Sequence, residues 1–173
     1  MKEQFKEIEI KNLQSNVFKM LENEWMLVTA GTKESFNMMT ASWGSFGILW
    51  NLPIAMAFIR PHRYTFNFIE TNSHFTLSFF DSKYKHILNY CGQHSGRAVD
   101  KVKETGLIPL YTDSGSISFE QSQLILECRK IYSDDIKAEK FIEKEIINTI
   151  YPTKDFHRMF IGEIIHCFSL NKI

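Results

Sequence analysis

The stretch Asn37-Met38-Met39-Thr40-Ala41-Ser42-Trp43-Gly44 has the pattern of a β-strand or of the margin of a sheet. Polar side chains are interspersed with Met and Ala in it, and a glycine ends the run. Its small residues would allow main-chain N–H groups to come close to a flat ring that lies against the strand. A half-buried strand whose hydroxyl groups face solvent would have the same pattern, so this stretch alone leaves both interpretations open.

Further runs of strand length lie on both sides of this stretch. Residues 25–30 and 54–59 are apolar runs, and a turn is predicted before the second one at Asn51-Leu52-Pro53. From Phe75 to Phe80, Phe and Leu alternate with Thr and Ser, which predicts a strand with two different faces. Three more strand-like runs lie in the second half of the chain, at 117–119, 124–129 and 160–168.

The predicted helices lie between these runs, and most of them are short. The shorter ones are predicted at 15–22, 66–70, 84–90 and 97–105. Ser15 would cap the first of these and Thr65 the second. The longest helix is predicted over 138–149, where apolar residues recur in helical register. Because strands outnumber helices, the sequence predicts a mainly β fold with peripheral helices, a closed or nearly closed barrel that forms a single domain over residues 1–173.

Length and composition place the chain among globular proteins. Its 173 residues suffice for one domain with a core of its own, and hydrophobic residues make up 44% of them. The 20 Lys and Arg balance the 20 Asp and Glu, so the chain lacks the basic surplus of a protein that binds nucleic acid or a membrane surface. No apolar run approaches the ~20 residues that cross a bilayer, and the first residues contain no signal-peptide core.

The cysteines and histidines show no metal-binding or redox pattern. Cys91, Cys128 and Cys167 form no CxxC pair, which favours free and mostly buried thiols in a reducing compartment, so we expect a cytoplasmic protein. The histidines lack the spacing of metal ligands, and HExxH, GxGxxG and Walker motifs are absent from the sequence. Metal-dependent, Rossmann and P-loop enzymes therefore have no support.

Two segments combine cations, hydroxyl groups and glycine in a way that suits phosphate binding. Arg60-Pro61-His62-Arg63-Tyr64-Thr65 follows a predicted strand and opens a predicted helix, so its arginines could fork onto phosphate oxygens while Thr65 adds a hydroxyl. Ser95-Gly96-Arg97 begins the next predicted helix, where Gly96 would let the backbone approach a ligand and Lys101 could reach back to the same anion. Taken singly, the first segment is better explained as a surface turn with solvated arginines, and the second as a capped helix with a charged face.

Taken together and in this order, the segments resemble the flavin reductase-like domain family, and within it the flavoredoxin group. The resemblance runs from about Trp25 to Glu163. Ala98 stands where the motif commonly has an acidic residue, a departure that leaves the phosphate-binding positions intact. Besides the two segments at 37–44 and 60–65, the resemblance rests on Cys91-Gly92-Gln93-His94-Ser95-Gly96-Arg97-Ala98-Val99-Asp100-Lys101 and on Arg158-Met159-Phe160-Ile161-Gly162-Glu163-Ile164.

The resemblance implies a homodimer of FMN-binding split β-barrels, with FMN near the interface between the two subunits. It implies a flavoprotein oxidoreductase, a flavin reductase that takes a hydride from NADH or NADPH and passes electrons through FMN to free flavin, a redox partner protein or a small acceptor. The alternative is an FMN-binding electron-transfer protein without a nicotinamide site of its own. In either case the cofactor carries the chemistry, and no protein nucleophile or pair of catalytic carboxylates is needed.

The resemblance also assigns site residues. Those implied around the flavin are Asn37, Met39, Thr40, Ala41, Ser42 and Trp43. Those implied around the ribityl phosphate are Arg60, Arg63, Tyr64, Thr65, Ser95, Gly96 and Lys101. His157 precedes the run at 160–168 that the resemblance brings near the flavin, so it is the predicted catalytic side chain, one that helps to place the nicotinamide. The alternative for His157 is a surface or packing histidine.

Overall fold

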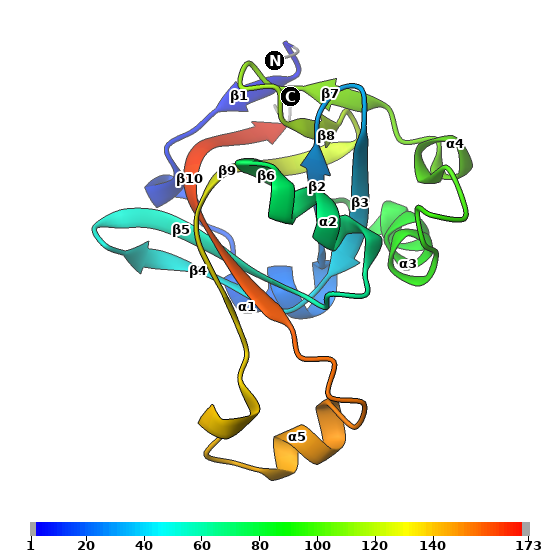
Figure 1. Cartoon of the computed structure of the whole chain (residues 1–173). Coiled ribbons are helices and arrows are strands. Elements are labelled where there is room, and N and C mark those ends of the chain that lie inside the picture. Colours follow the sequence, from blue (N-terminus) through cyan, green and yellow to red (C-terminus); the bar gives the residue numbers. More distant parts are fainter. Residues whose placement is uncertain (1–2, 171–173) are drawn as a thin grey trace.

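The computed structural model describes residues 3–170 and is mainly β (Figure 1). Its strands are β1 (Phe5–Glu7), β2 (Met26–Gly31), β3 (Phe36–Ala41), β4 (Gly44–Leu49), β5 (Leu52–Ile59), β6 (His74–Phe80), β7 (Pro109–Tyr111), β8 (Ile117–Phe119), β9 (Ser122–Asp135) and β10 (Arg158–Leu170). Its α-helices are α1 (Val17–Lys19), α2 (Tyr64–Thr71), α3 (Lys85–Gln93), α4 (Lys101–Thr105) and α5 (Glu145–Ile150). Short turns of other helix types lie at Ile10–Asn12, Met20–Glu24, Ser82–Tyr84 and Ala138–Lys140.

The large sheet closes on itself because its two edge strands are neighbours in the sequence. Its strands pair antiparallel in the order β3-β2-β6-β9-β10-β5-β4, and β1 pairs with the C-terminal end of β10. β3 and β4 lie at opposite ends of this order, yet only Ser42 and Trp43 join them. The sheet therefore curls round until its edges approach each other, as Figure 1 shows, and these two residues mark the seam of the barrel. The predicted mainly β barrel with peripheral helices is confirmed.

β6 shows why one predicted strand has two different faces. Its Phe75, Leu77 and Phe79 side chains enter the core cluster inside the barrel, together with side chains of β2, β5, β9 and β10. Its hydroxyl side chains face the hairpin of β7 and β8 instead. The Thr76 hydroxyl donates to the carbonyl of Ile117, and the hydroxyls of Ser78 and Ser118 are 2.8 Å apart. Both faces are buried, so the alternation separates apolar packing from hydrogen-bonded packing.

The turn between β4 and β5 lies slightly earlier than predicted. The residues at the turn are Trp50 and Asn51, whose φ angles are 53° and 61°. Leu52, which was predicted to be in the turn, already begins β5. Left-handed backbone at two successive residues is typical of hairpin turns, because it matches the twist of the strands on either side.

None of the three side chains predicted at helix starts caps its helix. Asn16 rather than Ser15 caps α1, since its side chain accepts a hydrogen bond from a main-chain N–H of that helix. Thr65 lies inside the first turn of α2. Ser95 precedes a turn, and α4 starts only at residue 101, with Asp100 as its cap. The predicted helix over 97–105 is therefore wrong in its first turn.

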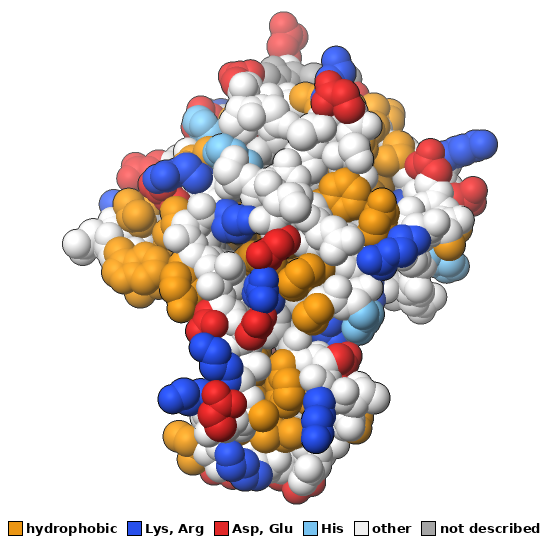
Figure 2. All heavy atoms as spheres, viewed as in Figure 1, with side chains coloured by type: hydrophobic (Ala, Val, Ile, Leu, Met, Phe, Trp, Pro, Cys, Tyr) orange, Lys and Arg blue, Asp and Glu red, His pale blue; other side chains and the backbone are white. Residues whose placement is uncertain are grey.

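Between β9 and β10, residues 136–157 leave the barrel as an arm (Figure 1). The helix predicted over 138–149 is wrong, because a single 3-10 turn and the short α5 take its place. Phe141 lies between them and packs on Tyr151, with ring centroids 6.1 Å apart, whereas Ile142 is 92% exposed. Apolar side chains gather on the face of the arm that Figure 2 shows. A long helix would need a second apolar surface to rest on, and the arm has only this small cluster of its own.

The cysteines are free and buried, as predicted. Within residues 3–170, no group of His, Cys, Asp and Glu side chains could hold a metal ion. In the same part of the chain, no helix is long and apolar enough to cross a membrane.

Candidate functional site

Every side chain predicted for the site lines one of two adjoining cavities beside the seam of the barrel. The first, called here the seam cavity, has a volume of about 370 Å³ and is lined by Met39, Thr40, Ala41, Ser42, Trp43, Phe58, Arg60, His62, Arg63 and His157. The second, called here the loop cavity, has a volume of about 240 Å³ and is lined by Asn37, Met39, His62, Arg63, Tyr64, Thr65, Gln93, His94, Ser95, Gly96 and Lys101. The two cavities share Met39, His62 and Arg63.

The seam cavity has an apolar wall and few free side-chain hydrogen-bonding groups. The Thr40 hydroxyl comes from β3, but it already donates to the carbonyl of Leu88 in α3 at 2.5 Å. The ring of Trp43 lies against that of His157, with centroids 4.9 Å apart, and Phe58 of β5 adds to the wall. Only Ala and Ser separate Thr40 from Trp43. Because their side chains are small, the main-chain N–H and C=O groups of this connection are the hydrogen-bonding groups that could contact the edge of a flat ligand.

Arg63 is the cation that both cavities share. Its Nη2 donates to the carbonyl of Gly92 at 2.6 Å. Among residues 3–170 no carboxylate forms an ion pair with it. Loss of hydration in its half-buried position lowers the pKa of the guanidinium. A guanidinium beside a cavity and without a counter-ion is a group that a bound anion would stabilise.

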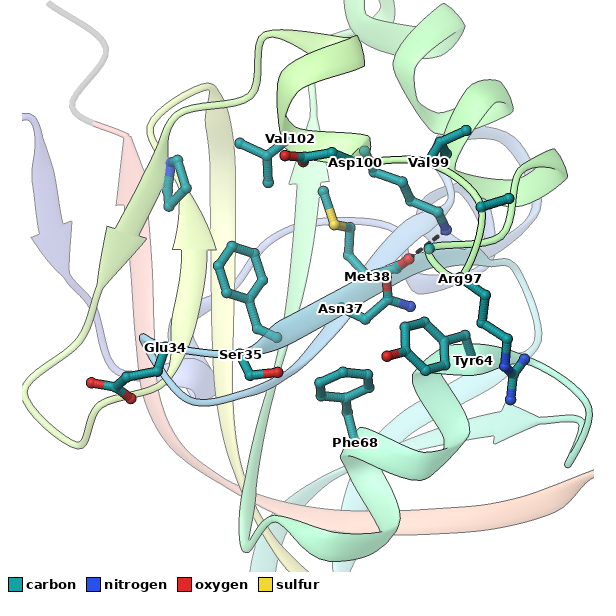
Figure 3. Close-up of a pocket in the computed structure, with 15 residues that line it drawn as sticks. Glu34, Ser35, Asn37, Met38, Tyr64, Phe68, Arg97, Val99, Asp100 and Val102 are labelled. Atoms are coloured by element: carbon teal, nitrogen blue, oxygen red, sulfur yellow. Dashed lines mark hydrogen bonds between the residues drawn. The ribbon is translucent and has the colours of Figure 1, made fainter.

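Lys101 brings a second cation to the loop cavity from the start of α4. Only 4% of it is exposed, and its Nζ donates to the carbonyls of Met38 and Cys91 at 2.7 and 2.8 Å; the bond to Met38 is drawn in Figure 3. An ammonium group has three N–H donors, so one remains for a ligand. Burial lowers the pKa of Lys101 to about 8, and the positive charge of Arg63 acts in the same direction.

At Gly96 the main chain of the loop lies unusually close to Asn37 of β3 and forms one side of the loop cavity. A Cβ atom at this position would lie 2.0 Å from Oδ1 of Asn37 and 3.1 Å from the Tyr64 ring. Asn37 is itself fixed, because its Nδ2 donates to the Thr65 hydroxyl at 2.7 Å in a buried bond between β3 and α2. Ser95 accepts a hydrogen bond from the N–H of residue 97 at 3.2 Å. The glycine therefore allows the 95–97 main chain to lie directly against β3.

Arg60 lines the seam cavity but is already engaged. Its Nη1 donates to Asp155 at 2.5 Å and its Nη2 to the carbonyl of Ile150 at 3.0 Å. Its guanidinium also lies over the Tyr151 ring, 5.4 Å from the centroid. Hydrogen bonds from Thr153 and then from Arg60 lower the pKa of Asp155 to about 2, so the pair stays charged at neutral pH. The structure thus joins Arg60 to the arm and does not leave it as a free fork for phosphate.

His157 is buried at the base of the arm, not on the surface. Its Nδ1 lies 2.9 Å from the hydroxyl of Tyr151, and the residue is 8% exposed. Burial lowers the pKa of His157 to about 4, and the positive charge of Arg60 adds to this effect while Asp155 opposes it. The imidazole is therefore neutral at pH 7.

Sequence reasoning missed the residues that support these side chains. Asp155 pairs with Arg60 and lies 3.5 Å from Nδ1 of His62. His62 lines both cavities, although only its arginine neighbours were expected to act. Tyr151 holds His157. Asp155 and Tyr151 lie about 90 residues from their partner Arg60 in the sequence, so no local pattern points to them.

A third cavity, of about 610 Å³, shares Asn37, Tyr64, Gly96 and Lys101 with the loop cavity and is also lined by residues 97–100 (Figure 3). Tyr64 and Phe68 stand edge to face in its wall, with ring centroids 5.0 Å apart. Arg97 lies over the Tyr64 ring at 4.7 Å and donates to the carbonyl of His62 at 3.1 Å. Arg97 lines this third cavity but not the loop cavity.

A fourth cavity, of about 970 Å³, adjoins the seam cavity and is mostly apolar. The two share Ser42, Trp43 and Phe58. Phe18 and Trp43 are 84% and 45% exposed, so this apolar hollow is open in the single chain. Its remaining lining residues are Val17, Phe18, Leu21, Glu22, Gly44, Ser45, Phe46 and Ile136.

Comparison with known proteins extends the likeness found in the sequence. Residues 19–172 match the family model described as flavin reductase like domain, and this span contains all residues that line the seam and loop cavities. The search of curated proteins gives no match.

Several solved structures share the fold. The flavoredoxin from Methanosarcina acetivorans is 23% identical, with a TM-score of 0.66 over 92% of this chain and 76% of that chain. An FMN-binding protein from Thermus thermophilus, solved with p-hydroxybenzaldehyde, is 19% identical, with a TM-score of 0.67 over 95% and 83%. An NADH:FAD oxidoreductase from Streptomyces globisporus is 16% identical, with a TM-score of 0.64 over 84% and 74%. At these identities the likeness shows a common fold, and it confirms the predicted FMN-binding type of split β-barrel.

Proposed function

Because this chain belongs to the flavin reductase-like domain family, we propose that it binds FMN and acts as an NAD(P)H-dependent oxidoreductase. One observation carries the proposal: a cavity with an aromatic wall, bounded by the main chain of the seam, adjoins a smaller cavity that is lined by two cations. A flat ring with a phosphate tail needs this combination of surfaces. Electrons would leave for free flavin, a redox partner protein or a small acceptor.

The residues of the loop cavity fit the phosphate of FMN. Among residues 3–170, Arg63 has no acidic partner and Lys101 has one N–H that no protein group accepts. Because Gly96 has no side chain, the main chain can lie close to Asn37 at the wall of the loop cavity. Asn37 and Thr65 bond to each other and fix the wall behind them. These groups would hold the phosphate by charge-assisted hydrogen bonds, and together they set the depth to which the ligand enters.

The residues of the seam cavity would hold the ring end of the cofactor. Ala41 and Ser42 leave room for main-chain contacts, while Trp43 and Phe58 exclude water from one side. Bound FMN would supply the acceptance of a hydride and the release of electrons. His157 is neutral there, so its part is to place a ligand by hydrogen bonding, not to deliver a proton.

The affinity for two flavins tests the site. FMN should bind at least about tenfold more tightly than riboflavin, because riboflavin lacks the phosphate and charge-assisted hydrogen bonds contribute about 1.5–3 kcal/mol each. Fluorescence titration measures both affinities. Equal affinities would overturn the assignment of the loop cavity.

Anaerobic mixing with each nicotinamide tests the reaction. The absorbance of protein-bound FMN should bleach with NADH or with NADPH, and the faster reaction identifies the preferred nicotinamide. If FMN binds but neither nicotinamide bleaches it, the protein is an electron-transfer flavoprotein and the oxidoreductase proposal fails.

We also propose a homodimer in which a second copy covers the fourth cavity. Exposed Phe18 and Trp43 border that cavity, and Trp43 belongs to the seam cavity too. An apolar hollow of this size beside a ligand site is typical of a surface that another protein covers. Closed two-fold symmetry is the commonest arrangement for such a contact.

The proposed compartment is the cytoplasm. Three buried, unpaired cysteines support it, because thiols stay reduced there.

A further inference from the structure

The His157 imidazole has a partner on the arm that belongs to none of the expected motifs. The hydroxyl of Tyr151, in the residue that follows α5, lies 2.9 Å from Nδ1 of His157. Tyr151 is 3% exposed and His157 is 8% exposed, so water competes little for this bond. Within residues 3–170, no hydrogen bond to Nε2 of His157 is found, and the residue lines the seam cavity.

The surroundings determine which group donates in this bond. Burial raises the pKa of the Tyr151 phenol, and this outweighs the opposing effects of the Arg60 charge and of a hydrogen bond from the main chain of His157. The phenol therefore keeps its proton at neutral pH. Its O–H needs an acceptor, and Nδ1 is the side-chain acceptor within reach.

We propose that Tyr151 is a positioning residue that donates to Nδ1 of His157 and holds the neutral imidazole in the tautomer with its proton on Nε2. The seam cavity then has one permanent N–H donor beside Trp43, directed by a residue of the arm. The tautomer itself depends only on the protein, whereas its use in the cavity rests on the proposed flavin site.

Four titratable groups surround His157, and their arrangement keeps it neutral. Arg60 lies over the Tyr151 ring and pairs with Asp155, while His62 lies 3.5 Å from the same carboxylate. The positive charge of Arg60 disfavours a second proton on His157, a protonated His62 would act in the same direction, and the negative charge of Asp155 favours it. Burial acts in the same direction as Arg60 and is the largest effect. The donor on Nε2 therefore persists across the neutral pH range.

A fixed neutral donor suits one kind of ligand atom. It can hold the carboxamide oxygen of a nicotinamide against the seam. It transfers no proton, because its second nitrogen is occupied by the phenol. Tyr151 does not line the cavity itself, and its hydroxyl acts on the cavity through His157.

Nitrogen-15 NMR of histidine-labelled full-length protein, without added flavin, tests the tautomer. The His157 signals are assigned with His157→Asn and followed between about pH 5 and about pH 8, where an ordinary histidine titrates. The expected spectrum has a protonated Nε2 and an unprotonated Nδ1 throughout. Tyr151→Phe should move the two shifts toward each other, as in a mixture of tautomers. Tyr132→Phe, which removes an exposed hydroxyl on β9, should leave them unchanged.

Three results would each overturn the proposal. The first is a proton on Nδ1 in the wild type, and the second is a His157 titration midpoint near the ordinary value of about 6.5. The third is a Tyr151→Phe spectrum in which the two nitrogen shifts are unchanged. The role in the cavity has a kinetic test. Tyr151→Phe should slow the reduction of bound FMN by roughly three- to tenfold, the worth of one hydrogen bond, with FMN affinity unchanged. An unaltered rate overturns that role. Failure of the wild type to bind FMN overturns the proposed function instead, and the tautomer is still decided by the spectra.

Discussion

At the scale of single residues, Arg63 and Arg60 look alike in the sequence but differ in their partners. Arg63 has no acidic partner among residues 3–170, while Arg60 is held by Asp155. Arg63→Ala should therefore weaken FMN binding by about tenfold or more, since a charge-assisted bond is worth about 1.5–3 kcal/mol. Riboflavin binding should change much less. Fluorescence titration of both ligands provides the measurement.

Arg129→Ala is the matched control for this variant. Arg129 is an exposed arginine on β9 that pairs with Glu163 and lines neither cavity. Its removal should leave both affinities unchanged. If Arg63→Ala weakened FMN and riboflavin equally, Arg63 would be supporting the fold of the site and would not be a phosphate ligand.

Lys101 should make phosphate binding depend on pH in the alkaline range. Its folded-state pKa of about 8 lies below the ordinary value, so it loses its charge as the pH rises through about 8. The ratio of FMN to riboflavin affinity should fall severalfold between about pH 7 and about pH 9.5. The flavin ring is common to both ligands, so its own titration cancels from the ratio. In Lys101→Met the ratio should be lower and independent of pH.

The same group has a stability effect of known sign in the unliganded protein. Between about pH 8 and the unfolded-state pKa of about 10.4, the unfolded chain binds more protons than the folded chain, so this group makes stability rise with pH. Below about pH 8 the burial of the charged ammonium lowers the free energy of unfolding by its full amount.

For the binding prediction, a ratio of FMN to riboflavin affinity that stays constant with pH in the wild type would show that the Lys101 charge does not act on the phosphate.

Sequence patterns pointed to the residues that line the two cavities, but not to the residues that fix those side chains in place. Thr40, Arg63 and Gly96 lie where the motifs predict, because short segments bring cations and small residues to one place. The engagement of Arg60 depends on Asp155, which is 95 residues away in the chain. Such a pairing exists only after the arm has folded back on the barrel, so no spacing rule reveals it.

At the scale of elements, Gly162 decides how β10 lies against the core. A Cβ atom there would be 2.7 Å from Cβ of Cys128 and from the Phe75 ring, next to a shift of register between β9 and β10. Gly162→Ala should lower the free energy of unfolding by about 1–3 kcal/mol through overpacking. Gly47→Ala in β4 is the control, since a Cβ atom added at Gly47 would have nothing within 4 Å. Urea unfolding compares the two, and equal stabilities would contradict the packing argument.

Strands were easier to predict than helices in this chain, and the reason is physical. β2 and β6 are buried on both faces, and their sequences show this as a nearly continuous apolar run in β2 and a regular apolar alternation in β6. The helices lie on the periphery, and their ends depend on single caps such as Asn16 and Asp100, which compete with equally suitable neighbours. The segment 138–149 has helical spacing but no surface to pack on, so its pattern does not become a long helix.

At the scale of the whole molecule, the seam of the barrel links the ligand site to the exposed apolar surface. Ser42 and Trp43 join the two edge strands, and both line the seam cavity and the fourth cavity. A second copy seated on the fourth cavity would therefore complete the wall of the seam cavity. Assembly and binding of the flavin ring should then be coupled, whereas the residues that line the loop cavity do not line the fourth cavity.

Phe18→Asp separates these possibilities. Phe18 is 84% exposed, so its replacement should leave the fold of one chain intact while placing a charge in the apolar contact between copies. Sedimentation should show a dimer for the wild type and a monomer for the variant. Because the ring wall would be incomplete, FMN and riboflavin should both bind more weakly, unlike the selective loss expected for Arg63→Ala. Ile108→Asp, at a half-exposed site that lines none of the four cavities, should remain dimeric with both affinities unchanged. A wild type that sediments as a monomer and still holds FMN would contradict the coupling between assembly and binding.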